Sequence, residues 1–247
     1  MALKKTLTSQ NQNNPRPLAL MDNITINKNS NEFDKSNKIY TKFKKKLQKY
    51  LNAYQVKKIE KAFRVANEAH RGQLRKSGEE YIHHPLSAAS ILADFQLDHE
   101  SIMAAILHDV IEDTKINAKD IQNEFGKEIS EIVTALTKLT NDENNLIQNV
   151  DQKNMRRFLV SMAKDVRVII IKLADRLHNV ETLEYLDLDK REKIAKETLS
   201  IHAPLAQKIG MNDLKWRLED ESFKHLMPDK FKMTKRLISQ KREEREI

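Results

Sequence analysis

One short segment of the sequence places a histidine and three carboxylates directly behind an apolar stretch. The segment is Leu107-His108-Asp109-Val110-Ile111-Glu112-Asp113-Thr114, and residues 102–106 before it are all apolar. In a continuous helix, residues four apart lie about 6 Å apart on one face, so His108 would stand over Glu112. Asp109 would stand over Asp113 in the same way. Because burying carboxylates without partners costs on the order of several kcal/mol, the segment predicts a bound cation or a buried polar network.

Two further ligand candidates stand elsewhere in the chain. His84 occurs in Tyr81-Ile82-His83-His84-Pro85 and Asp175 in Leu173-Ala174-Asp175-Arg176-Leu177-His178-Asn179, each bordering an apolar helix. A His-Asp pair alone more often occurs by chance or caps a helix than binds a metal. The additional candidates favour a metal site. Together they offer two imidazoles and two carboxylates for one site.

The chemistry of such a site follows from its ligand types. The chain has no Cys, so any metal must be held by His, carboxylates, carbonyls or water. Manganese, magnesium, iron and zinc all suit these ligands, and the sequence does not choose among them. A divalent ion with open positions would bind water, lower its pKa and neutralise phosphate charge, which favours hydrolysis of a phosphoester.

A second candidate site is the segment from Ala69 to Tyr81, whose two glycines indicate a loop. It carries three cations, which are Arg71, Arg75 and Lys76. Arg can hold an anion in a fixed fork and Lys acts as a point charge, so the loop could clamp a phosphate. Tyr81 could stack on a nucleobase. The alternative interpretation is a basic loop that is simply solvated.

The elements that must position these groups are predicted to be helices. The 247 residues include 4 Gly and 5 Pro, with abundant Leu, Ile, Ala, Lys and Glu, which favours an all-α fold of roughly nine or ten helices. Apolar residues fall at helical spacing from Tyr54 onward. Helix ends are indicated by Pro85 in a first turn, Asn117 as an N-cap, and Gly126 and Gly210 beyond C-termini. Asp189 with Glu192 resembles a capping box that begins a helix running to about Ile209.

The chain divides into three parts. Residues 1–37 are rich in Asn, Ser, Lys and Gln, show no apolar period and are expected to be a disordered leader. Residues 38–229 are expected to form the helical domain, and residues 230–247 a charged helix or linker. The net charge of +8 comes from the N-terminal part, because residues 1–60 carry 13 Lys/Arg and 4 Asp/Glu whereas the remainder carries 31 and 32.

The five lysines between Lys42 and Lys49 could touch RNA or a membrane surface, although a solvated charge run is the more common explanation. Few aromatic residues accompany them, so nucleic-acid binding is not expected. No apolar run approaches the roughly 20 residues that span a bilayer, and a cytoplasmic protein is expected. The oligomeric state is left open.

These motifs together resemble the N-terminal hydrolase domain of the RelA/SpoT-homologue alarmone enzymes, members of the HD superfamily. The resemblance covers about Tyr54 to Phe231, with the motifs in the same order and spacing, and it implies an HD-domain multi-helix bundle. Its carriers are Ala69-His70-Arg71-Gly72-Gln73, Arg75-Lys76-Ser77-Gly78, Tyr81-Ile82-His83-His84-Pro85, His108-Asp109-Val110-Ile111-Glu112-Asp113-Thr114, Thr137-Lys138-Leu139, Lys172-Leu173-Ala174-Asp175-Arg176-Leu177-His178-Asn179 and Ala203-Pro204-Leu205-Ala206.

The resemblance implies a role for each motif. The ligands of a manganese ion, or of another divalent cation, would be His84, His108, Asp109 and Asp175. Glu112 and Asp113 would position or activate the attacking water. The pocket for guanosine and phosphate would be lined by Arg75, Lys76, Asn179 and Thr182, with Ser77 and Tyr81 as additions. The implied reaction removes the 3′-pyrophosphate of ppGpp or pppGpp, giving GDP or GTP and pyrophosphate, and degrades the alarmone of the stringent response.

Three departures from the family pattern bear on this expectation. Glu80 stands where the family usually has Pro, and Glu181 stands where Arg is usual. A carboxylate at residue 181 would weaken phosphate binding if it faces the substrate and would be harmless if it faces solvent. The chain also has no room for the synthetase domain of long family members, so alarmone synthesis is not expected. A natural stand-alone hydrolase, a fragment and the product of a split gene all remain open.

Two other functions compete with this interpretation. Another HD phosphohydrolase could act on a dNTP or on NADPH, and the Arg75-Lys76-Ser77-Gly78 loop favours the alarmone over these. A catalytically silent (p)ppGpp-binding module would keep the fold. Such a decayed domain typically shows substituted ligands, whereas every ligand candidate is present in this chain.

Overall fold

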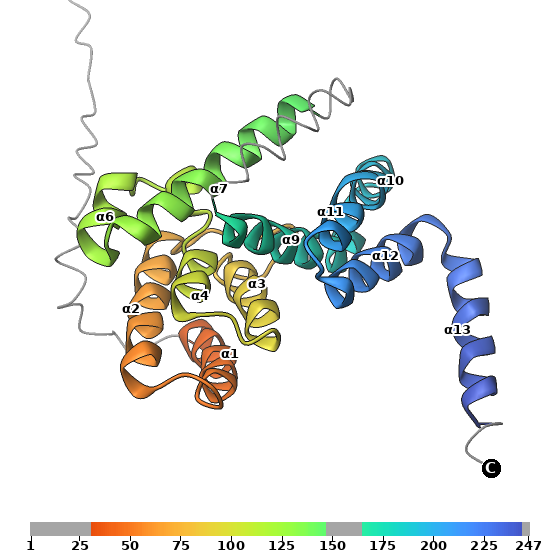
Figure 1. The fold of residues 1–247 in the computed structure, drawn as a ribbon, viewed down its shortest axis with the longest axis horizontal. Coiled ribbons are helices and arrows are strands. Elements are labelled where there is room, and N and C mark those ends of the chain that lie inside the picture. The colour runs from red at the N-terminus through yellow and green to blue at the C-terminus, as the bar shows by residue number, and fades with distance from the viewer. Residues whose placement is uncertain (1–30, 147–164, 244–247) are drawn as a thin grey trace, which may run out of the picture.

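The computed structural model describes residues 31–146 and 165–243. These residues form helices and connecting turns, with one isolated bridge between Leu74 and Glu80 and no strand (Figure 1). The all-α prediction is therefore confirmed. None of the helices in the two described ranges is long and apolar enough to cross a membrane.

The helices follow one another with short breaks. In chain order they are α1 (Asn31–Leu47), α2 (Ala53–Ala69), α3 (His83–Asp94), α4 (His99–Ile106), α5 (Val110–Asp113), α6 (Ala118–Phe125), α7 (Lys127–Leu146), α9 (Val166–Glu181), α10 (Leu188–Glu197), α11 (Ala203–Lys208), α12 (Asn212–Leu226) and α13 (Pro228–Glu243). A 3-10 turn, η2 (Leu183–Tyr185), follows α9, and a π-helical turn, η3 (Thr198–His202), joins α10 to α11.

Helices α3, α4 and α9 pack against one another at the centre of the molecule, with α2 against α4. The sequence explains this arrangement, because every residue of α4 from Ser101 to Ile106 is buried and most of the buried residues of α9 are apolar. Alanines on α3, including Ala89 and Ala93, are buried and leave room for close packing. In Figure 1, α6 and α7 lie on one side of this core and α10 to α13 on the other, with α13 projecting outward.

The segment with the His-Asp pair is not one continuous helix. Helix α4 ends at Ile106 and α5 begins at Val110, so His108 and Asp109 lie in the turn between them. The Ala105 carbonyl, which a continuous helix would offer to the backbone amide of residue 109, contacts the His108 ring at 2.7 Å instead. The expected continuous helix is therefore wrong here, and the break allows both side chains of the pair to point into the core.

Most of the predicted helix ends are confirmed. Asn117 caps α6 with a complete capping box, and Gly126 and Gly210 follow helices with φ of 93° and 79°. The prediction at Asp189 is wrong, because α10 is capped at Asp187 and Asp189 lies inside the helix. The long helix predicted to run to about Ile209 is observed as α10, the π-helical turn η3 and α11, which follow one another without a break.

Helix α1 begins at Asn31, inside the segment that was expected to be a leader, and residues 1–30 lie outside the described part of the chain. Part of its lysine run is neutralised within the fold. Lys44 contacts Glu60 and Lys46 contacts Asp94, both at 2.7 Å. These pairs favour the interpretation of the run as a solvated helix face.

Candidate active site

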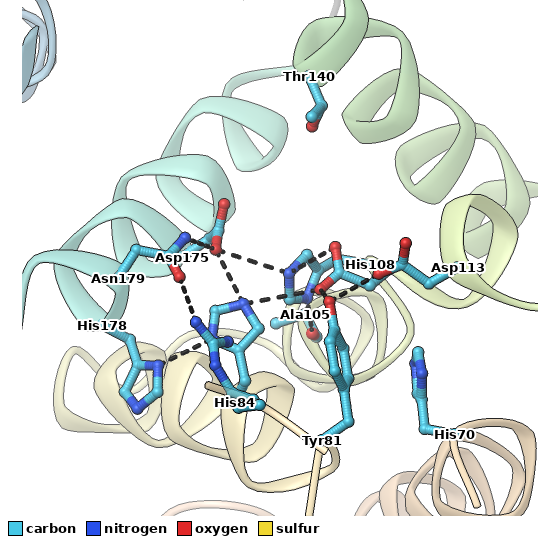
Figure 2. A network of polar contacts seen from close by, with 12 residues as sticks. His70, Tyr81, His84, Ala105, His108, Asp113, Thr140, Asp175, His178 and Asn179 are labelled. Carbon is cyan, nitrogen blue, oxygen red and sulfur yellow. Dashed lines mark hydrogen bonds and ion pairs between the residues drawn. The ribbon is translucent and has the colours of Figure 1, made fainter. Parts of the chain in front are cut away.

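The four side chains predicted as metal ligands meet at the centre of the fold. They come from three places, since His84 lies in the first turn of α3, His108 and Asp109 lie in the turn between α4 and α5, and Asp175 lies on α9. Figure 2 shows His84, His108 and Asp175 facing one another across the interface of these helices. Segments separated by about 90 positions in the sequence thus build one cluster because α3, α4 and α9 pack together.

Both imidazoles direct Nε2 toward the carboxylates. His84 Nε2 lies 3.0 Å from Asp175 Oδ1 and 3.6 Å from Asp109 Oδ2. His108 Nε2 lies 3.1 Å from Asp109 Oδ1 and 3.7 Å from Asp175 Oδ1. One ligand atom from each of His84, His108 and Asp109 lies within 4.8 Å of the other two, which is a group that can hold a metal ion. Asp175 is not one of these three residues, although its Oδ1 lies 3.0 Å from His84 Nε2 and 3.7 Å from His108 Nε2.

The state of the His108 ring fits a metal ligand. Its Nδ1 lies 2.7 Å from the Ala105 carbonyl oxygen, which can only accept, so Nδ1 carries the proton and donates. In the neutral form of the ring the lone pair is then on Nε2, and this buried atom has no hydrogen-bond partner among the described residues. A buried lone pair that faces two carboxylates lacks the partner that a divalent cation would supply.

Asp175 accepts hydrogen bonds from two side chains of its own helix, α9. Its Oδ1 accepts a hydrogen bond from Asn179 Nδ2 at 2.7 Å, and its Oδ2 accepts one from Lys172 Nζ at 3.0 Å. Lys172 also contacts Thr140 Oγ1 of α7 at 3.2 Å. The two oxygens thus have different partners, and Oδ1 is the one that faces the imidazoles.

The electrostatics of the cluster favour a bound cation. Burial opposes ionisation of Asp175, yet Lys172 and the imidazoles hold the pKa of its carboxyl well below the usual value. Burial also opposes ionisation of Asp109, and His108 nevertheless keeps its pKa low. For His108 itself, burial acts to lower the pKa, but the Asp109 carboxylate raises it to about 9. The carboxylates therefore stay charged and attract whatever positive charge can enter.

Tyr81 joins the ligand cluster to the carboxylate pair of α5. Its hydroxyl lies 2.6 Å from Asp113 Oδ2 and 2.9 Å from Asp109 Oδ2. Its ring stacks on His70, with centroids 4.6 Å apart and planes inclined by 22°. Tyr81 thus has contacts within the protein at both its ring and its hydroxyl, and its stacking on a nucleobase stays a prediction.

The two remaining carboxylates lie at the edge of the cluster. The Asp113 carbonyl accepts a hydrogen bond from Gln73 Nε2 at 3.0 Å, and the Asp113 carboxylate contacts Tyr81 as described above. The side chain of Glu112 is mostly exposed. The partial burial of its carboxyl group and the nearby charges of Asp109 and Asp113 raise its pKa. A carboxylate with a raised pKa next to a metal-binding cluster is suited to accept a proton.

The predicted phosphate loop reaches α9 through one side chain. Arg75 Nη2 donates to Asn179 Oδ1 at 2.8 Å, and its guanidinium lies 5.9 Å from the Tyr81 ring centroid. Lys76 is exposed. Ser77 Oγ accepts from the Glu79 amide at 3.4 Å, and Thr182 Oγ1 donates to the His178 carbonyl at 3.0 Å. Asn179 therefore contacts the ligand cluster through Asp175, and Arg75 is linked to the cluster through Asn179. Lys76, Ser77 and Thr182 lie within three residues of these two along the chain.

Glu181 does not share the face of α9 that carries the cluster. Asp175, His178, Asn179 and Thr182 follow one another at helical spacing on that face. Glu181 is offset from them and accepts a hydrogen bond from Arg217 Nη2 of α12 at 3.0 Å. Its negative charge is therefore paired within the protein on the side facing α12.

Three contributors were not singled out in the sequence. His178 Nδ1 lies 2.8 Å from His84 Nδ1, Lys172 binds Asp175, and His70 supports Tyr81. Helical spacing could have found two of them, because Lys172 and His178 are each three residues from Asp175 and share its face. The position of His70 depends on how the loop folds back, which no local pattern reports.

The geometry agrees with comparisons to known proteins. A family model described as "HD domain" matches residues 62–212. The chain belongs to the HD-domain family. Its matched range contains all four ligand candidates as well as Glu112 and Asp113.

Several named proteins resemble this HD domain. The bifunctional (p)ppGpp synthase/hydrolase SpoT of Escherichia coli is 44% identical over 192 residues, covering 78% of this chain and 27% of that protein. A guanosine-3′,5′-bis(diphosphate) 3′-pyrophosphohydrolase of Borreliella burgdorferi is 41% identical over 218 residues, covering 87% of this chain and 32% of that protein. The chain thus spans about a quarter to a third of the length of these relatives.

A solved structure also matches. It is described as a metazoan ortholog of SpoT that hydrolyses ppGpp, with 28% sequence identity and a TM-score of 0.50. The match covers 72% of this chain and 99% of that protein. The resemblance to the RelA/SpoT hydrolases is therefore confirmed.

Proposed function

We propose that this HD domain is a guanosine-3′,5′-bis(diphosphate) 3′-pyrophosphohydrolase, which converts ppGpp or pppGpp to GDP or GTP and pyrophosphate. The observation that carries the proposal is the convergence of four ligand candidates beside the Arg75–Asn179 pair. The names of the relatives and the description of the metazoan structure support the same substrate class. Degradation of the alarmone in the stringent response would be the biological role, and a cytoplasmic location suits a nucleotide substrate.

The proposed cofactor is manganese, held by His84, His108, Asp109 and Asp175. Nitrogen and carboxylate ligands suit this ion, and the orientation of the His108 lone pair supports a cation at this place. When bound, such an ion lowers the pKa of a water molecule and offsets the charge of a phosphate.

The substrate would approach from the side of the loop between α2 and α3. Arg75 is fixed by Asn179, so its remaining guanidinium donors can bind phosphate oxygens without first being ordered. Lys76 is exposed and would add a second positive charge. Ser77, Tyr81 and Thr182 are proposed to complete the pocket for guanosine and phosphate.

Glu112 and Asp113 would have different roles toward the attacking water. Asp113 is held by Tyr81 and would orient the water, and Glu112, with its raised pKa, would accept a proton from it. The water oxygen forms a bond to the phosphorus attached to O3′, and the bond between that phosphorus and O3′ breaks. The 3′ oxygen takes up a proton and leaves as the nucleoside hydroxyl, while both phosphates leave as pyrophosphate.

The test is release of pyrophosphate from ppGpp by the purified chain in the presence of Mn²⁺. EDTA and the variant His108→Ala provide the negative controls, and dGTP and NADPH are assayed in parallel. We expect GDP and pyrophosphate in equal amounts, with loss of activity in both controls. Turnover of dGTP or NADPH alone would replace the alarmone by another substrate, and tight ppGpp binding without turnover would identify a silent binding module.

A further inference from the structure

His84 has a second histidine directly behind it. The ring of His178 lies 5.0 Å from the ring of His84, centroid to centroid, and their Nδ1 atoms are 2.8 Å apart. On the opposite side of the same ring, His84 Nε2 faces Asp175 Oδ1 at 3.0 Å. Figure 2 shows this row, with His178 and the ligand cluster on opposite sides of His84.

The short distance fixes the roles of the two Nδ1 atoms. One must donate and the other must accept, since two lone pairs or two protons at 2.8 Å would repel each other. If His84 uses Nε2 as its ligand atom, its proton is on Nδ1 and His178 is the acceptor. A metal-binding histidine is commonly held by such a partner on its other nitrogen, which sets both the tautomer and the ring orientation.

The fold also explains why His178 is well placed for this role. His84 is almost completely buried in the first turn of α3, so its ring orientation depends on neighbours from the protein and not on water. His178 lies on α9, one turn after Asp175, and therefore contacts His84 from the same helix that supplies another ligand. The hydrogen bond thus ties the two ligand-bearing helices together directly beside the cluster.

We infer that His178 is a positioning residue that orients His84 Nε2 toward the metal, an inference that rests on the proposed metal site. His178 is not itself one of the ligand candidates. Removing the acceptor frees the His84 ring to rotate or to change tautomer, and loss of such a partner typically reduces metal affinity 10-fold to 100-fold.

The experiment compares Mn²⁺ affinity in the full chain and three variants, measured by electron paramagnetic resonance of the free ion. His178→Phe keeps an aromatic ring but removes the acceptor, and His178→Asn offers an amide oxygen near the position of Nδ1. His99→Phe is the matched control, because His99 is a half-buried histidine at the far end of α4 from His108. Circular dichroism of each variant verifies that the fold is retained.

We expect about a 10-fold to 100-fold weaker Mn²⁺ affinity for His178→Phe, with His178→Asn and His99→Phe close to the unmodified chain. Affinity within threefold of the unmodified chain in His178→Phe would overturn the inference while leaving the metal site intact. Equal losses in His178→Phe and His178→Asn would also overturn it, because the ring shape and not the acceptor would then matter. An unmodified chain that binds no Mn²⁺ would overturn the metal site itself and the inference with it.

Discussion

The two carboxylate oxygens of Asp175 have different roles, because one is held by the protein and the other faces the ligand cluster. Its Oδ2 is bound by Lys172 within α9, while its Oδ1 faces the two imidazoles and accepts from Asn179. The lysine offsets part of the cost of burying a carboxylate and leaves the other oxygen for a cation. Asp109 is similar in that Tyr81 contacts its Oδ2 while Oδ1 lies nearest to His108.

The substitution Asp109→Asn separates charge from shape. The amide oxygen can still accept from Tyr81, so we expect the fold to persist, whereas loss of one negative ligand should weaken Mn²⁺ binding at least about 100-fold and abolish hydrolysis. Mn²⁺ titration and pyrophosphate release measure the two effects. Asp94→Asn is the control, because Asp94 pairs with Lys46 outside the site. Equal Mn²⁺ affinities in the two variants would place the ion elsewhere.

The variant Glu181→Gln tests whether the negative charge at residue 181, where the family usually has Arg, affects catalysis or stability. Glu181 binds Arg217 on the side facing α12, so we expect kcat/KM for ppGpp to change by less than about twofold. Both partners are about one third exposed or more, so solvent screens the pair and the free energy of unfolding should fall by at most about 1 kcal/mol. Steady-state kinetics and urea unfolding test both statements, and a tenfold rise in kcat/KM would mean that Glu181 faces the substrate after all.

At the scale of one element, α4 depends on the residue that caps its N-terminus and on the position of its C-terminus. Asp98 caps the helix, accepting from the Ser101 amide at 2.9 Å and from the Ser101 hydroxyl at 2.7 Å. Arg167, at the start of α9, lies 3.8 Å from the same carboxylate. The cap therefore holds α4 beside α9, and the end of α4 delivers His108 and Asp109 to the cluster.

Replacing Asp98 by Ala should lower the free energy of unfolding by about 1 kcal/mol at pH 7. Burial acts to raise the pKa of Asp98, but the hydrogen bonds from Ser101 lower it below the usual 3.8. A lowered pKa gives stability that is present above pH 3.8 and is lost as the pH falls through the folded-state value. Urea unfolding between pH 7 and pH 3 should therefore show a constant difference from the unmodified chain down to about pH 4, which then narrows.

The variant Asp98→Asn is the control for this titration. Asparagine can still accept at the cap but carries no charge, so its cost at pH 7 should be smaller than that of Asp98→Ala, and the difference between these two variants should not change with pH. A difference between Asp98→Ala and the unmodified chain that grows on acidification would contradict the assignment of the cap.

The elements also show what sequence reasoning can and cannot reach. Asn117 and Gly126 were found because caps depend on neighbours within one turn. The break between α4 and α5 was missed, because it accompanies the contact of the buried His108 ring with Ala105, and burial there is decided by α3 and α9. The start of α10 after Asp187 was missed because the Asp187 side chain makes no capping hydrogen bond, and Asp189 carries the same side chain two residues later.

For the whole molecule, composition was enough to predict helices, and the motifs with their resemblance were enough to predict which residues meet. The pairwise geometry was not accessible, because it depends on the packing of α3, α4 and α9. The roles of Tyr81 and His178 illustrate this limit. Each role is defined by a contact with a segment that is distant in the sequence. Helical spacing places His178 on the same face as Asp175, but it does not reveal the contact with His84.

Removal of the metal should lower the stability of the whole fold. The candidate ligands join α3, the turn after α4, and α9, so the complete ligand set exists only in the folded chain. At a free Mn²⁺ concentration of 100 times Kd, binding should stabilise the chain by about 2.7 kcal/mol and raise Tm by roughly 5 to 10 °C relative to the chain in EDTA. Thermal melts followed by circular dichroism measure this shift, which Asp109→Asn should lose and Asp94→Asn should keep. An equal shift in both variants would mean that Mn²⁺ stabilises the chain at another place.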